Sequence, residues 1–252
     1  MHSFFAFAAI TLPWLNPFTF GPTPAVLPWL FSTICLLMLI SVVTLMDTSQ
    51  LVRVSTSAWL TAAGLSAVLG LLQYFGATEW LGVWANGTRL GEAFGNLRQR
   101  NQYATLTSIG LWVALWFATQ NYAIKNKAPY ADGISVVAGF AFIILALGNA
   151  ASGSRTGLMQ WIVIAAIALW WQRQGTKKIG FLALMALALY GVGLFLLPLE
   201  LKLLTQVDSA GLMGRLGENV GCSSRKVLWS NVLYLIAQKP WFGWGWGELD
   251  YA

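Results

Sequence analysis

The chain has 252 residues, of which 57% are hydrophobic and only 10% are charged. Soluble domains carry about 25% charged residues, so this composition excludes an ordinary soluble domain as well as a disordered chain. The formal net charge is +6. In a membrane protein such an excess arises from topology signals, contact with anionic lipids or an anionic substrate.

Long uncharged apolar runs recur along the chain and predict an all-α, polytopic transmembrane bundle of about seven helices. The first run, 4–20, is interrupted by Pro13 and Pro17 and is therefore expected to be short or broken. A proline-rich connection, 21–28, follows it. The other spans are predicted at about 25–46, 56–76, 103–120, 133–150, 156–172 and 179–197.

The spans predict two regions: a transmembrane helical domain, 1–197, with a polar loop at 77–102, and a more polar tail, 198–252. No Asp, Glu, Lys or Arg lies within the seven spans. Ion-coupled transporters keep ionisable groups near mid-membrane. The uncharged spans therefore argue against such a transporter and place any chemistry at the membrane surface.

Basic residues are distributed unevenly between the two sides of the membrane. With seven spans, the segments 77–102, 151–155 and 198–252 share one side, which holds nine basic residues against six on the other. That count makes the first side cytoplasmic, whereas the short lysine-dense loops 121–132 and 173–178 favour the second side. We favour the second, because short loops carry most of this signal. Six of the eight arginines lie on the first side: Arg89, Arg98, Arg100, Arg155, Arg215 and Arg225.

Arginines also stand at the starts of three predicted helices, the third of them an amphipathic stretch at 225–239. A helix N-terminus binds anions through free N–H groups, and arginine adds two parallel donors suited to phosphate. Three such ends on one membrane face could hold a diphosphate. The alternative is that each arginine only extends to the surface or pairs with lipid phosphate or with Glu79, Glu92 or Glu218.

Motifs of several other enzyme classes are missing. No phosphate-binding G-x-x-x-x-G-K-[ST] loop and no acidic D-x-D pair occur, and one histidine with two cysteines leaves no zinc constellation. We expect no cofactor, no metal and no nucleic-acid partner. The glycine-rich segment 243–247 follows no strand–helix unit, so we interpret it as a bend held by aromatic side chains.

Five motifs run along nearly the whole chain: Leu12-Pro13-Trp14-Leu15-Asn16-Pro17-Phe18 with Gly21-Pro22, Gln99-Arg100-Asn101-Gln102, Ser152-Gly153-Ser154-Arg155-Thr156, Ser224-Arg225 with Trp229, and Pro240-Trp241-Phe242-Gly243-Trp244-Gly245. Together they resemble the bacterial protein O-oligosaccharyltransferases of the PglL type, the pilin glycosylation ligases. This superfamily includes the O-antigen ligases and the Wzy O-antigen polymerases.

The resemblance implies a GT-C-like membrane glycosyltransferase in the bacterial inner membrane. It would take a glycan from undecaprenyl diphosphate at the periplasmic face and pass it to Ser or Thr of a pilin or another exported protein. The step would need neither a metal nor a nucleotide sugar, and the arginine-rich side would be periplasmic. An O-antigen ligase or Wzy polymerase would use the same donor with another acceptor. A lipid-linked-glycan transporter is a further alternative.

We predict that Arg100, Arg155 and Arg225 bind the diphosphate and stabilise the charge that develops as the glycosidic bond breaks. Further ligands of the diphosphate or glycan are predicted at Arg98, Asn101, Gln102, Ser154 and Arg215. The acceptor hydroxyl needs a base. The acidic candidates are Glu92, Glu218, Glu248 and Asp250.

The resemblance also implies a longer protein. Family members are usually about twice this length and continue into a large periplasmic loop with a functionally important histidine, followed by more spans. The tail 198–252 corresponds to the start of that loop. We therefore expect the chain to be an N-terminal fragment that lacks the acceptor-activating group and is inactive alone.

Overall fold

The computed structural model describes residues 1–19, 26–97, 99–125, 131–174, 178–209, 211–212 and 220–244. Side chains are described for these residues except 120–125, 131–138 and 220–226. The regular structure of the described residues is entirely helical, so the predicted all-α class is confirmed. The elements are α1 (His2–Leu15), η1 (Pro17–Thr19), α2 (Val26–Val43), α3 (Thr48–Tyr74), η2 (Glu79–Trp84), α4 (Arg100–Lys125), α5 (Ala131–Ala151), α6 (Arg155–Arg173), α7 (Ile179–Thr205) and α9 (Val220–Gln238).

Helices α1 to α7 coincide with the seven apolar runs. Within the described ranges, three of them, α2, α3 and α7, are long and apolar enough to cross a membrane. The other four predicted spans, and the GT-C-like architecture, stay predictions. For example, α1 has 14 residues, fewer than the roughly 20 that span a bilayer.

Several helix ends differ from the predicted span ends; α3, for example, begins at Thr48 and not at 56. α1 ends at Leu15, and residues 17–19 form a 3-10 turn, because Pro17 disfavours helical backbone at the residue before it. α7 instead continues through Pro198 to Thr205 and ends at Gln206 with a positive φ of 57°. The segment predicted as the polar tail therefore begins inside a helix.

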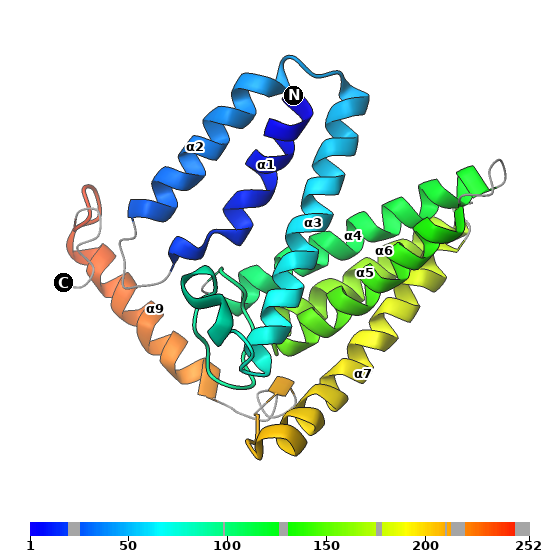
Figure 1. Cartoon of the computed structure of the whole chain (residues 1–252). Helices are drawn as coiled ribbons and strands as arrows, with labels where there is room; N and C mark the ends of the chain where they lie inside the picture. The colour runs from blue at the N-terminus through cyan, green and yellow to red at the C-terminus, as the bar shows by residue number, and fades with distance from the viewer. Residues whose placement is uncertain are drawn as a thin grey trace. The chain divides into compact units, whose positions relative to one another are not determined.

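The chain divides into two compact units, Met1–Leu212 and Met213–Ala252. The first unit contains α1 to α7 (Figure 1). The second contains α9, which is followed by a bend. There the indole nitrogen of Trp244 donates to Leu235 O at 3.0 Å, and Lys239 Nζ lies 3.9 Å from the centre of the Trp244 ring. An aromatic bend after α9 is thus observed up to Trp244, whereas 245–247 lie outside the described residues.

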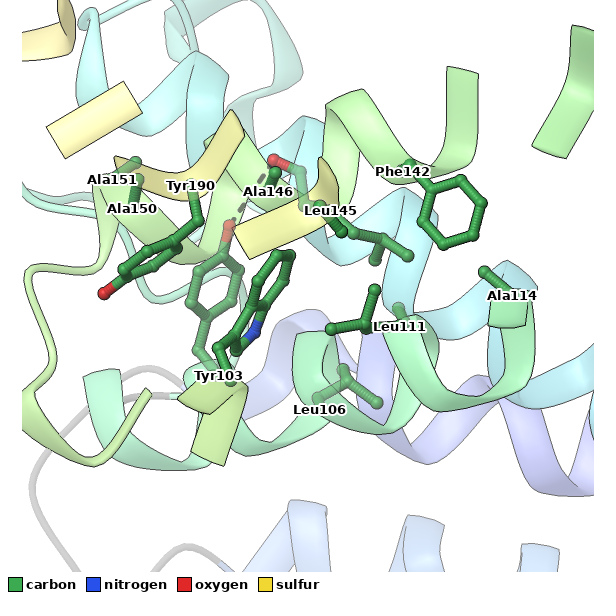
Figure 2. Packing of buried hydrophobic residues seen from close by; sticks show 14 of the residues in the cluster. Tyr103, Leu106, Leu111, Ala114, Phe142, Leu145, Ala146, Ala150, Ala151 and Tyr190 are labelled. Carbon is green, nitrogen blue, oxygen red and sulfur yellow. Dashed lines mark hydrogen bonds between the residues drawn. The ribbon is translucent and has the colours of Figure 1, made fainter. Parts of the chain in front are cut away.

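Small residues allow α3, α4 and α5 to pack closely in the core of the first unit. Tyr103 of α4 is fully buried (Figure 2), and its hydroxyl donates to Ala67 O of α3 at 3.4 Å. Gly70 and Gly148 face the same ring: a Cβ atom at Gly148 would lie 3.0 Å from Tyr103 Oη, and one at Gly70 would overlap it. The aromatic ring therefore fills the space that two missing side chains leave.

Two contacts gather the polar segments of the first unit at one end. Asn101 at the start of α4 hydrogen-bonds Ser154 at the start of α6, and the hydroxyls of Tyr74 and Ser209 lie 3.0 Å apart. We call this end the polar end: it comprises the end of α3, the loop 75–99, the starts of α4 and α6, and residues 206–209 (Figure 1). Parts of 77–102, 151–155 and 198–252 thus lie together in the first unit, whereas their side of the membrane stays a prediction.

Candidate functional site

One serine hydroxyl both caps α6 and joins it to α4. Ser154 Oγ accepts from the backbone N–H of Gly157 at 3.2 Å, which satisfies a donor that the first helical turn leaves free. The same hydroxyl donates to Asn101 Oδ1 at 2.8 Å. Ser154 is only 1% exposed. The two predicted ligands Ser154 and Asn101 therefore bind each other and hold two helix starts side by side.

The turn that delivers Ser154 is fixed by its own sequence. Ser152 Oγ donates to Asn149 O at 2.6 Å and accepts from the Ser154 N–H at 3.1 Å. Between them, Gly153 has a φ of 55°, a conformation that glycine adopts without steric cost. The Ser-Gly-Ser sequence thus ends α5 and starts α6 within three residues, so that Arg155 becomes the first residue of α6.

A buried amide on α5 fixes the opposite side of this junction. Asn149 is fully buried, and its Nδ2 donates to Ala104 O at 2.9 Å and to Thr107 Oγ1 at 2.7 Å, both on α4. Gly157 of α6 approaches the same place closely: a Cβ atom there would overlap Asn149 Oδ1 and lie 3.0 Å from Ala104 Cβ. Asn149 was not among the residues predicted from the sequence.

The loop 75–99 is held by a second set of buried amides. Gln73 is 1% exposed and bonds Gly95 twice: its Nε2 donates to Gly95 O at 2.8 Å and its Oε1 accepts from Gly95 N at 2.8 Å. The Nδ2 of Asn96 donates to Leu15 O and Trp84 O, each at 3.0 Å. These contacts attach the loop to α1 and α3 and so position the chain that leads into Arg100.

Arg100 is the first residue of α4 and forms an ion pair with Glu92. Its Nη2 lies 3.1 Å from Glu92 Oε1, and the two side chains are 34% and 28% exposed. Pairing with Glu92 is the alternative that the sequence analysis gave to diphosphate binding by this arginine, and the structure contains this pair. An ion pair this exposed contributes about 0–1 kcal/mol, so it leaves Arg100 accessible to a more highly charged anion.

Arg155 and Gln102 also lie at the polar end, and both are exposed. Arg155 begins α6 immediately after the Asn101–Ser154 contact, whereas Arg100 immediately precedes it on α4. Two arginines from helices far apart in sequence therefore flank one hydrogen bond. The described contacts do not bring Gln102 into that bond.

The remaining predicted residues are not placed at this site. Arg225 lies on α9, which begins at Val220 rather than at the predicted residue 225, so Arg225 is inside the helix and not at its start. Its side chain is outside the described residues, and α9 belongs to the second unit. The others outside the described residues are Arg98, Arg215, Glu218, Glu248 and Asp250.

Among the described residues, no group of three His, Cys, Asp or Glu side chains could hold a metal ion. The arginines and amides of the polar end are hydrogen-bond donors and cations, which is the chemistry that binds an anion.

Two segments of the chain match known protein families. Residues 140–252 match a family described as "O-Antigen ligase", and residues 93–118 match a family described as "Protein glycosylation ligase". The predicted resemblance to these ligases is confirmed. The first match contains Ser154 and the second contains Asn101, so the hydrogen bond between these residues joins the two ligase-like segments.

One characterised relative has the same description. The chain is 30% identical over 201 residues to the "O-antigen ligase" of Pseudomonas aeruginosa strain PAO1, in a match that covers 77% of this chain. The match covers 40% of that protein, so the chain spans well under half the length of its relative. No solved structure matches the chain.

Proposed function

We propose that the protein transfers an oligosaccharide from undecaprenyl diphosphate to Ser or Thr hydroxyls of a pilin or other exported protein. The reaction takes place where the polar end meets the periplasmic face of the bacterial inner membrane. The observation that carries this proposal is the junction of α4 and α6, where Arg100 and Arg155 flank the Asn101–Ser154 hydrogen bond. Its support from relatives is the ligase description of both matched segments.

The proposed chemistry is a displacement at the anomeric carbon of the first sugar. The acceptor oxygen forms a bond to this carbon as the bond to the diphosphate oxygen breaks, and the diphosphate leaves with the electron pair. Arg100 and Arg155, with Arg225 as the predicted third cation, would stabilise the charge that develops on the leaving group. Asn101 and Ser154 act as supports, because their hydrogen-bonding groups already bind each other and the α6 backbone.

The acceptor hydroxyl must lose its proton to a base. Glu92 is the one predicted acidic candidate whose side chain lies in the described part of the chain, and it pairs with Arg100. In this proposal Glu92 holds the guanidinium of Arg100 in place until the diphosphate arrives, and the proton of the acceptor hydroxyl passes to the histidine that the family resemblance implies. Arg100 should be attracted more strongly to a diphosphate than to Glu92, because a partly exposed ion pair contributes only about 0–1 kcal/mol.

The test is glycan transfer in membranes by the full-length gene product, with a polyprenyl-diphosphate glycan and a pilin acceptor. Arg100→Ala, Arg155→Ala and Arg225→Ala should each reduce transfer by about 10² to 10³, the usual cost of one donor to developing charge. Arg53→Ala and Arg173→Ala, at the opposite helix ends of α3 and α6, are matched controls and should transfer normally. Normal transfer by all three site variants would refute the proposed role of the arginines.

A second candidate differs only in the acceptor. The relative in Pseudomonas aeruginosa is named an O-antigen ligase, and the longer family match has the same description. The acceptor would then be lipopolysaccharide or, in a Wzy-type polymerase, the growing polymer. Deletion of the gene distinguishes these cases: loss of a glycan mass from pilin supports protein glycosylation, whereas an altered lipopolysaccharide ladder with unmodified pilin supports the second candidate.

A further inference from the structure

A groove of about 420 Å³ runs between α4 and α6, beside the Asn101–Ser154 junction. This volume lies in the range of small-molecule sites. We call it the α4–α6 groove. It forms because α4 packs mainly on α3 and α5, whereas α6 packs mainly on α7. Its lining residues are Thr105, Ser108, Ile109 and Trp112 of α4 and Thr156, Met159, Gln160, Val163 and Ile164 of α6.

Polar side chains that line the groove hydrogen-bond one another. Ser108 Oγ donates to Gln160 Oε1 at 3.0 Å, and Gln160 Nε2 donates to Thr105 Oγ1 at 2.9 Å. Apolar side chains of the groove are open to the surroundings: Met159 is 63% exposed and Val163 is 51% exposed. The groove therefore presents an apolar face and offers a ligand few unpaired hydrogen-bonding groups, which suits a hydrocarbon chain.

One end of the groove lies near the helix starts that carry the arginines. Thr156, which lines it, follows Arg155 directly, and Thr105 is five residues after Arg100, about 7 Å along the helix axis. Both helices begin at this end, so their free N–H groups add partial positive charge. A lipid whose chain lies in the groove would thus place its head group beside two cations and two helix N-termini.

We propose that the α4–α6 groove binds the first isoprene units of the lipid diphosphate donor and holds its diphosphate at Arg100 and Arg155. This inference rests on the proposed function and assigns the lipid part of the donor to a specific surface. Charge complementarity favours a diphosphate over a phospholipid, because a diphosphate carries more negative charge than a single phosphodiester. The groove and the arginines act together, since an anchored head group raises the local concentration of its own chain.

The bilayer limits what the groove can contribute. An acyl chain of a neighbouring lipid is as apolar as a polyprenyl chain, so exchange of one for the other yields little hydrophobic free energy. The groove is therefore expected to fix the direction of the donor and the position of its anomeric carbon. Blocking it should raise the KM for the donor and lower the efficiency of transfer, while the protein stays folded.

The experiment uses the intact protein in detergent and a polyprenyl diphosphate that carries a diazirine in its first isoprene units. After illumination, we expect labelled peptides from α4 and α6, suppressed by unlabelled polyprenyl diphosphate but not by an equal concentration of phosphatidylglycerol. Met159→Trp and Val163→Trp, which fill an exposed part of the groove, should each lower this labelling about tenfold. Met185→Trp, at an exposed methionine of α7, is the matched control and should label normally.

Three results would overturn the inference: labelling confined to other helices, undiminished labelling in both groove variants, or equal suppression by phosphatidylglycerol. The last result would make the groove a site for bulk phospholipid. Labelling is measured without an acceptor, so it is independent of transfer. Transfer by the unmodified protein with no groove labelling refutes only the groove, whereas groove labelling without any transfer refutes only the proposed function.

Discussion

Ser154 Oγ lies 2.8 Å from Asn101 Oδ1, and this hydrogen bond joins the first turns of two helices that begin 55 residues apart. Because Ser154 also caps α6, the removal of one oxygen atom breaks both contacts.

Ser154→Ala should lower the free energy of unfolding by about 1–2 kcal/mol and reduce glycan transfer. Thermal unfolding in detergent measures the first effect. Ser41→Ala on α2, where the exposed hydroxyl bonds only Met38 O of its own helix, is the control. Equal unfolding temperatures for the two variants would contradict the role of Ser154.

The close approach of α4 and α6 depends on a missing side chain at position 157. Gly157→Ala should push Ala104 and Asn149 away, at a cost of about 1–3 kcal/mol from overpacking. The matched control is Gly64→Ala in α3, where an added Cβ meets nothing within 4 Å. That change should stabilise the protein by about 0.5–1 kcal/mol, since alanine favours helix over glycine. Opposite shifts in unfolding temperature are expected, and a shift in the same direction would contradict the packing described for Gly157.

Gln73 holds the loop 75–99 through four hydrogen bonds, two to Gly95 and one each to Asn86 O and Phe94 N. Gln73→Met keeps the size of the side chain but removes these bonds, each worth about 1 kcal/mol. The loop should then open, and trypsin should cleave after the exposed Arg89 much faster than in the unmodified protein. Gln50→Met, at the exposed start of α3, should leave cleavage unchanged. Equal cleavage rates in both variants would show that Gln73 does not restrain the loop.

Glu92→Gln separates two roles of this carboxylate. The ion pair with Arg100 is partly exposed, so its loss should change the free energy of unfolding by about 1 kcal/mol or less. If Glu92 only holds Arg100, the variant frees this arginine for the diphosphate, and the KM for the donor should fall with kcat nearly unchanged. A fall in kcat of about 10² to 10⁴ would instead identify Glu92 as the general base.

The sequence predicted helices α1 to α7 well because each contains an uncharged apolar run. It also placed Arg100 and Arg155 at helix starts to within a few residues, since the Ser-Gly-Ser turn and the polar segment before α4 are local signals. It failed where local signals mislead. The span predicted at 179–197 stops short of α7, which continues through Pro198 to Thr205. The helix predicted at 225–239 starts too late, because α9 begins at Val220.

Contacts between distant residues could not be predicted from the sequence. Nothing in the period of apolar residues indicates that Asn101 faces Ser154, or that Asn149 bonds α4. Both depend on which helices become neighbours and at what rotation. Gln73 and Asn149 were also hidden, because a single amide hardly changes the hydropathy of an apolar run although burial makes its hydrogen bonds obligatory. The arginines were visible in the sequence, whereas the residues that hold their helices were not.

The Asn101–Ser154 contact also sets the order in which the ribosome can complete this site. Asn101 emerges with α4, but its partner follows only after α5 has been synthesised and the turn at Gly153 has formed. Until then Asn101 lacks the serine hydroxyl, and the first turn of α4 lacks its neighbour. The two helix starts can therefore be held side by side only after the α4–α5 hairpin is in place.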